Sequence, residues 1–188
     1  MEAYAAGQRV FGENKAQELV TKHAQLPVDI EWHFIGHLQS NKVRYIAPFI
    51  SLIHSIDSLS LLQEVNREAL KNNRVIGCLL QLYIATEETK FGLSFEEAKS
   101  LLGDGTIQEL KNIRITGVMG MSSFTSDTAL IRSEFKTLHT WFNLLKDQFF
   151  SLDMNFRELS MGMSEDYPIA VEEGSTMVRI GTTLFGNR

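Results

Sequence analysis

With 188 residues, 44% of them hydrophobic and 22% charged, the chain has the composition of an ordinary globular protein and the length of one domain, residues 1–188. The formal net charge of −5 disfavours a general nucleic-acid surface, because phosphate backbones bind clustered basic residues. No apolar run approaches the roughly 20 residues of a membrane span, and the N-terminus has no signal-peptide pattern. The single cysteine, Cys78, has the apolar setting of a buried residue and suits a reducing compartment, so we expect a cytoplasmic protein.

Short apolar runs alternate with amphipathic stretches along the chain. The apolar runs predict seven strands, at residues 9–11, 31–35, 51–56, 75–84, 113–121, 158–161 and 177–180. Helical patterns follow the first six, at residues 15–23, 41–49, 58–72, 94–102 with 106–111, 128–150 and 168–173, and a polar tail follows the seventh. Ser58 is expected to be an N-cap, Ser94 opens a capping box, and Pro48 ends the second helix.

This regular alternation predicts parallel strands joined by crossover helices. An open sheet of the dinucleotide-binding type is disfavoured, because residues 11–14 (FGEN) lack the glycine-rich fingerprint after the first strand. A closed (β/α)8 barrel has eight strands and about 250 residues, so we expect an α/β fold of this type that lacks its first strand. Residues 1–7 agree with this, since they resemble the end of a helix that stops at Gly7.

Candidate ligand-binding residues lie where the last two strands end. Barrels of this type often bind phosphate through the loops after their seventh and eighth strands. Those loops contain Ser164 and the pair Gly181-Thr182. Small residues let backbone amides approach an anion, and hydroxyls can donate hydrogen bonds to it. Such residues are also common in ordinary turns, but their joint placement favours a phosphate site.

Arg179 lies two residues before Gly181 and therefore shares a face of the strand with it. If that face points into the barrel, the guanidinium would lie near the ligand. It would then keep a facing pyridine nitrogen unprotonated, because a fixed cation disfavours a second positive charge. An ion pair with Glu172 or Glu173 explains this arginine equally well at this point.

The remaining polar residues predict neither a metal site nor a hydrolase. His33, His37 and His54 fall on or near successive strands, but their spacing matches no metal site. We expect His33 and His37 in the core or just behind the ligand site. Ser164 lacks the Gly-x-Ser-x-Gly context of a hydrolase nucleophile. The acidic residues 165 and 166 are expected to cap the short helix that follows.

Several phrases resemble one known family. They occur in order over essentially the whole chain: AYAAGQRVFGEN, EWHFIGHLQSNK, SIDS, TKFG, GVMGM and LSMGMSEDYPIAVEEGSTMVRIGTTLFG. They are similar to those of the pyridoxal phosphate homeostasis proteins, single-barrel relatives of the alanine racemase N-terminal domain. The resemblance implies a modified TIM barrel that binds pyridoxal 5′-phosphate (PLP) and takes part in intracellular PLP homeostasis without a catalytic reaction. It also implies PLP-dependent apoenzymes as partners.

The resemblance assigns residues as well. It implies that Ser164, Gly181 and Thr182 hold the phosphate and that Arg179 faces the pyridine nitrogen. The other implied members of the pocket are Asn14 beside the cofactor, Met119 in the lining and, as a weaker candidate, Ser160. The phrase that contains Gly36, Gln39, Asn41 and Lys42 belongs to the family pattern without a physical role that the sequence explains.

One residue of the family pattern is missing. The Schiff-base lysine lies on the family's first strand, upstream of the AYAAGQR phrase, whereas Lys15, Lys42 and Lys90 belong to other motifs. We therefore expect non-covalent PLP binding at best. A fragment, or a gene model begun at an internal methionine, is the favoured explanation, and a truncated paralogue without cofactor or an engineered chain are alternatives. The rival function is a racemase-like or decarboxylase-like PLP enzyme, which would need a second β-domain.

Overall fold

The structure is a computed structural model that describes residues 1–85 and 91–186. Seven parallel strands form one sheet whose order follows the chain, with β1 and β7 at its two edges. The strands are β1 (Val10–Glu13), β2 (Glu31–Phe34), β3 (Leu52–Ile56), β4 (Ile76–Gln81), β5 (Ile113–Met119), β6 (Glu158–Met163) and β7 (Met177–Arg179). The sheet curves into a nearly closed barrel, as the alternation of apolar runs and helices predicted.

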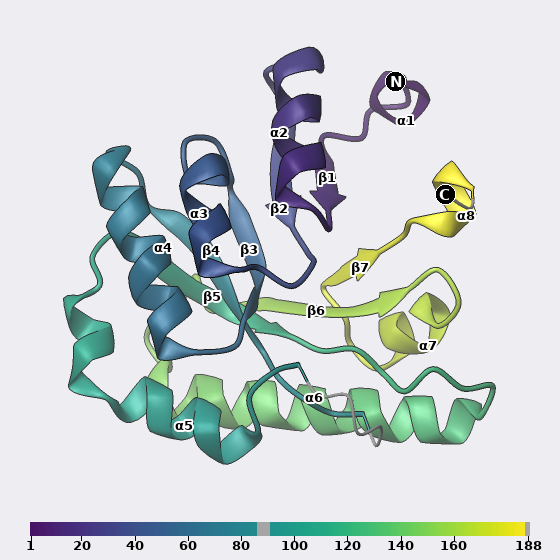
Figure 1. The fold of residues 1–188 in the computed structure, drawn as a ribbon. Helices are drawn as coiled ribbons and strands as arrows, with labels where there is room; N and C mark the ends of the chain where they lie inside the picture. The colour runs from purple at the N-terminus through teal and green to yellow at the C-terminus, as the bar shows by residue number, and fades with distance from the viewer. Residues whose placement is uncertain (86–90, 187–188) are drawn as a thin grey trace.

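Helices connect the strands and cover the outside of the sheet (Figure 1). They are α1 (Glu2–Ala5), α2 (Ala16–Gln25), α3 (Ser40–Ile46), α4 (Leu59–Lys71), α5 (Phe95–Gly103), α6 (Thr128–Phe149), α7 (Tyr167–Glu172) and α8 (Thr182–Phe185), with a 3-10 helix, η1 (Gly105–Glu109), after α5. In Figure 1 the two ends of the chain, at α1 and α8, lie on the same side of the molecule, next to the two edge strands. No helix in the described ranges is both long and apolar enough to cross a membrane.

Local sequence signals set the ends of several helices. The Ser58 hydroxyl accepts a hydrogen bond from the Leu61 amide at the start of α4. Ser94 and Glu97 form the expected reciprocal capping box at the start of α5. The chain leaves α1 through Gly7, whose φ of 100° is a left-handed conformation that favours glycine. These predictions from single residues are confirmed.

Three predicted elements differ from the structure. The polar tail after the last strand is wrong, because residues 182–185 form the short helix α8. The helix expected at 106–111 is the 3-10 helix η1, where the Asp104 side chain accepts a hydrogen bond from the Thr106 amide. The strand expected at 75–84 ends at Gln81, since the next residues turn to pair with Leu93: the Tyr83 amide donates to the Leu93 carbonyl and the Leu93 amide to the Gln81 carbonyl.

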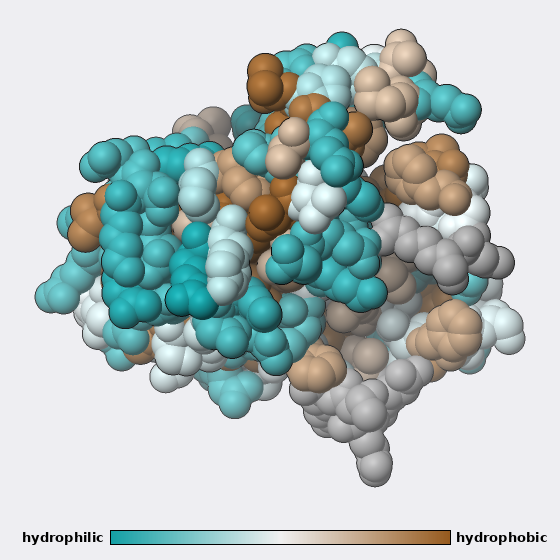
Figure 2. All heavy atoms as spheres, turned by 45° about the horizontal axis from the view of Figure 1, so that its top comes forward, coloured by the Kyte–Doolittle hydropathy of each residue, from teal (hydrophilic) through white to brown (hydrophobic). Residues whose placement is uncertain are grey.

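Apolar side chains fill both sides of the sheet. The larger cluster lies between the strands and the helices and includes the fully buried Phe34, Phe135 and Phe156. A smaller cluster consists of Leu52, Leu79 and Met119 with Met177 packed against it. Its members come from β3, β4, β5 and β7, so they meet inside the barrel. Outside, hydrophilic side chains cover much of the surface over α3 and α4 (Figure 2), as expected for amphipathic helices whose apolar faces meet the sheet.

Candidate functional site

The loops after β6 and β7 meet at the mouth of the barrel. The Ser164 hydroxyl oxygen lies 3.1 Å from the Gly181 amide nitrogen and 3.4 Å from that of Thr183, and both amides donate to it. Two backbone N–H groups are therefore directed at one oxygen atom. A Cβ atom built at Gly181 would meet nothing within 4 Å, so the space beside its Cα is open. Ser164, Gly181 and Thr182 are thus brought together, in an arrangement that fits an anion such as a phosphate.

Arg179 points into the barrel and does not pair with Glu172 or Glu173. Its Nη1 donates to the Ser160 hydroxyl at 2.7 Å, and its Nη2 donates to the Gly120 carbonyl at 3.0 Å. Glu172 and Glu173 bind Arg132 instead. Burial lowers the pKa of Arg179 to about 10, opposed by the charge of Asp166, so the guanidinium stays protonated at neutral pH.

Ser160 and Met119 lie deeper in the barrel than the loop pair. Ser160 is fully buried and sits between Arg179 and His54, whereas Met119 is 1% exposed and packs on Leu52 and Leu79. Both are on the inner side of the sheet, and Ser160 contacts Arg179 directly. Their direct contact with a ligand stays a prediction.

Asn14 follows β1 and is exposed. Its backbone touches Gly36, where an added Cβ would lie 2.3 Å from the Asn14 carbonyl oxygen and 2.8 Å from its Cα. Real side chains do not approach a backbone this closely, so only glycine fits at this position. This contact gives Gly36 a structural role: it lets the loop after β2 pack against the end of β1, where Asn14 lies. Because β1 and β7 are the two edge strands of a nearly closed barrel, Asn14 lies at the mouth on the edge that faces β7 across the gap.

Asp166 supports the loop that carries Ser164, in a way the sequence did not predict. It was expected to cap α7 with its side chain, but no such bond forms. Its carboxylate accepts hydrogen bonds from the Met163 amide at 2.6 Å and from the Ser122 hydroxyl at 2.6 Å. The loops after β5 and β6 are therefore tied together next to the anion position. The sequence offered one hint of this contact, an acidic residue two positions after Ser164.

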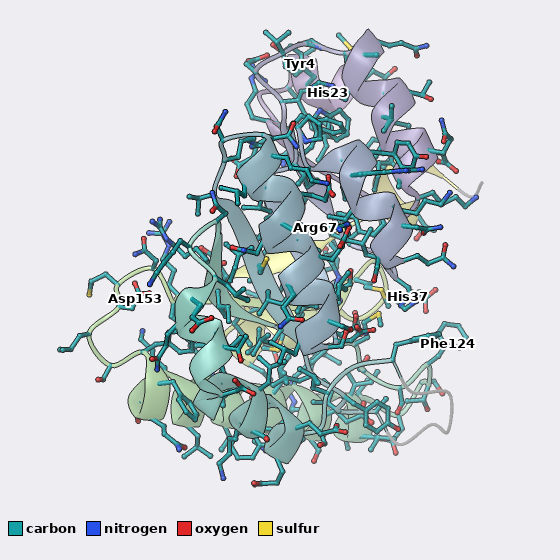
Figure 3. The ribbon with its side chains drawn as sticks, turned by 60° about the vertical axis from the view of Figure 1, so that its left-hand side comes forward. Tyr4, His23, His37, Arg67, Phe124 and Asp153 are labelled. Atoms are coloured by element: carbon teal, nitrogen blue, oxygen red, sulfur yellow. The ribbon has the colours of Figure 1, made fainter. Side chains whose placement is uncertain are left out.

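The three histidines separate into a buried pair and an exposed side chain. His33 and His54 are buried and lie side by side, with His54 Nε2 3.1 Å from His33 Nδ1. His37 was also expected in or near the core, but it is exposed and lies 3.7 Å from Asp57. Figure 3 shows His37 on the same side of the molecule as Phe124, and Asp153 on the other side. His37 and Phe124 follow β2 and β5, so this side is the mouth at which the strands end.

The described lysines lie outside the barrel strands. None of the seven strands contains a lysine. Lys15 precedes α2 and pairs with Glu18, and Lys42 lies on α3. Lys90 is outside the described residues. Over residues 1–85 and 91–186, no group of three or more His, Cys, Asp or Glu side chains is placed to hold a metal ion.

Comparisons with known proteins identify the family of the chain. A family model described as the alanine racemase N-terminal domain matches residues 1–188. The pyridoxal phosphate homeostasis protein of Aquifex aeolicus is 40% identical over 188 residues, which are 100% of this chain and 80% of that protein. The protein of the same name from Synechocystis is 42% identical over 193 residues, covering 99% of this chain and 84% of that one.

Solved structures give the same result. PipY from Synechococcus elongatus, with PLP bound, has a TM-score of 0.87 and 38% identity, covering 98% of this chain and 85% of that one. Alanine racemase from Bartonella henselae, at 19% identity and a TM-score of 0.66, covers 98% of this chain and 48% of that one and shows a shared fold. The match of the family model to the whole chain, together with the identity of 40%, shows that the chain belongs to the alanine racemase N-terminal domain family and, within it, to the pyridoxal phosphate homeostasis proteins.

Proposed function

We propose that the chain binds PLP at the mouth of the barrel and takes part in PLP homeostasis without catalysing a reaction. The proposal depends on one observation: a short segment at the end of β7 carries both anion-binding backbone amides and a buried guanidinium. The Gly181 and Thr183 amides converge on one oxygen position, and the Arg179 guanidinium lies inside the barrel two residues earlier. A ligand with an anionic group at one end and a neutral ring nitrogen at the other fits both.

The roles of the residues follow from their chemistry. The phosphate replaces the Ser164 oxygen as acceptor for the two amides, while the Ser164 and Thr182 hydroxyls donate to it. Arg179 disfavours protonation of the ring nitrogen, because a second positive charge beside a guanidinium is costly. When bound, PLP supplies a reactive aldehyde and an electron-withdrawing ring, and the ring withdraws electrons poorly while its nitrogen is unprotonated. The site therefore favours binding over catalysis.

The relatives support this proposal. Those from Aquifex aeolicus and Synechocystis are named for PLP homeostasis, and the PipY structure contains PLP. We further propose that the protein acts in the cytoplasm and exchanges PLP with PLP-dependent apoenzymes.

Equilibrium dialysis against PLP and against pyridoxal, which lacks the phosphate, tests the proposal. We expect PLP to bind at least about tenfold more tightly, because a charge-assisted hydrogen bond contributes about 1.5–3 kcal/mol. The Gly181→Val variant should lose this preference, since its branched side chain would fill the open space beside the Gly181 Cα, next to the two amides. Gly105→Val is the matched control, because a Cβ at Gly105 also meets nothing within 4 Å but lies in η1, away from the mouth.

Two results would overturn this proposal. Equal affinity for PLP and pyridoxal in the unaltered chain would show that the phosphate group has no binding site. Racemisation or decarboxylation of amino acids by the PLP-loaded chain, well above the rate with free PLP, would favour the enzyme alternative.

A further inference from the structure

A line of polar side chains crosses the inside of the barrel behind Arg179. Arg179 Nη1 donates to Ser160 Oγ at 2.7 Å, and this oxygen lies 3.0 Å from His54 Nδ1. His54 Nε2 lies 3.1 Å from His33 Nδ1. His33 Nε2 lies 3.4 Å from Glu31 Oε1. The line joins β7 and β6 to β3 and β2, so it spans strands that are not neighbours in the sheet.

The middle of this line is shielded from water. Ser160 is 0% exposed, His54 is 1% exposed and His33 is 4% exposed. The inner layers of such barrels are usually filled by branched apolar residues. Polar groups at these depths destabilise the fold unless each is hydrogen-bonded. Three buried polar side chains in one connected line therefore indicate a role other than packing.

Donor and acceptor chemistry gives the line a direction. An arginine has donors only, so Ser160 accepts from Arg179 and its own proton is available for His54 Nδ1. A neutral imidazole that accepts at Nδ1 carries its proton on Nε2, and in His54 this atom faces His33 Nδ1. The same step places the proton of His33 on Nε2, which faces the carboxylate of Glu31. All the bonds then run one way, from a guanidinium to a carboxylate.

The opposite direction leaves groups unsatisfied. It would give Ser160 two donors and no acceptor for its own proton. It would also turn the lone pair of His33 Nε2 toward the Glu31 carboxylate. Neutral imidazoles agree with the first direction: burial holds the pKa of His54 well below its usual value, and the neighbouring His33 and Arg179 act the same way. Burial also lowers the pKa of His33, against the opposing effect of Glu31 and Glu158.

We propose that His33, His54 and Ser160 are positioning residues whose one-way hydrogen bonds hold the Arg179 guanidinium in the orientation that faces the ring nitrogen of PLP. The bond to Ser160 fixes Nη1 and the bond to the Gly120 carbonyl fixes Nη2, so both ends of the planar group are held. His54 supplies the acceptor that directs the Ser160 hydroxyl. The identity of the ligand in this inference rests on the proposed function, whereas the direction of the hydrogen bonds depends only on side chains of the protein.

Histidine tautomers test the direction without any ligand. In protein labelled with ¹⁵N at the imidazoles, two-bond ¹H–¹⁵N correlation spectra at pH 7 distinguish the two neutral tautomers from the charged ring. We expect neutral Nε2–H tautomers for both His33 and His54, with the signals assigned from His33→Asn and His54→Asn variants. An Nδ1–H tautomer at His54, or a charged His33, would overturn the proposal.

A pair of variants at His54 tests the effect on Arg179. His54→Asn keeps an acceptor oxygen close to the position of Nδ1, whereas His54→Leu removes the acceptor at similar volume. We expect PLP affinity to fall about tenfold in His54→Leu and to stay within about threefold of the unaltered chain in His54→Asn. The pyridoxal affinity should fall by the same factor as the PLP affinity, since the phosphate contacts are unchanged.

Ser160→Ala removes the oxygen that accepts from Arg179, so PLP affinity should fall in this variant too. It serves as the second variant if His54→Leu does not fold. Equal PLP affinity in folded His54→Leu, Ser160→Ala and unaltered protein would refute the positioning role. If the unaltered chain bound no PLP, the proposed function would fail, and the tautomer spectra would still decide the direction of the hydrogen bonds.

Discussion

Gly36→Ala is expected to damage both the fold and the ligand site, because this position has no room for a side chain. The added Cβ would lie 2.3 Å from the Asn14 carbonyl oxygen, about 1 Å short of ordinary van der Waals separation, and 2.8 Å and 2.9 Å from two further backbone atoms of Asn14. Backbone atoms cannot move aside as the end of a flexible side chain can. Overpacking of this kind destabilises by about 1–3 kcal/mol. For a chain of this size, at about 2–4 °C per kcal/mol, that corresponds to a melting temperature lower by about 2–12 °C.

Differential scanning calorimetry and PLP dialysis measure the two effects of this substitution. Asn14 would be displaced together with the end of β1, so PLP affinity should fall along with stability. Gly105→Ala is the control, because a Cβ there meets nothing within 4 Å and the lost flexibility of the unfolded chain favours folding slightly. A Gly36→Ala protein that melts within 1 °C of Gly105→Ala would refute the argument from close packing.

Three further predictions concern buried groups. Ser55→Ala should leave the melting temperature unchanged or higher, since the Ser55 hydroxyl is buried without a hydrogen-bond partner in the described structure; a drop of several degrees would show an unrecognised bond. Cys78 should react with thiol reagents only in denaturant, because complete burial raises the pKa of its thiol, and full labelling in native buffer would contradict this. Burial lowers the pKa of both His33 and His54, so the unfolded chain binds more protons and stability should fall as pH drops from 7 through the ordinary histidine range near 6.5. Combined His33→Asn and His54→Asn substitution should flatten this slope in thermal melts between pH 7 and 5, and an unchanged slope would assign it to other groups.

The order of the elements was predictable from local pattern alone. Parallel strands in an α/β fold need crossover helices, so the alternation of apolar and amphipathic segments indicated both the strand direction and the barrel. Ser58 and Ser94 marked helix starts through hydrogen bonds to residues three positions away, which a sequence displays directly. The approach of Ser164 to Gly181 was also predictable, because consecutive parallel strands end at the same edge.

Contacts between distant strands were not predictable in the same way. His54 and Ser160 are 106 residues apart, and only the curvature of the sheet brings β3 opposite β6. Gly36 belonged to a recognisable phrase, but the reason for a glycine there is the close approach of the Asn14 backbone, just after β1. Asp166 followed a local rule for helix capping in the sequence, whereas the tertiary bond to Ser122 determines its orientation. At the mouth of the barrel, contacts between loops therefore outweighed the local preference of an acidic residue for capping a helix.

A crystal structure of the chain grown with PLP is the most direct test of the central claim. The account predicts the phosphate within hydrogen-bond distance of the Gly181 and Thr183 amides, with Ser164 turned to donate to it and Arg179 beside the ring nitrogen. A phosphate bound elsewhere, or a ring nitrogen directed away from Arg179 at full occupancy, would contradict it.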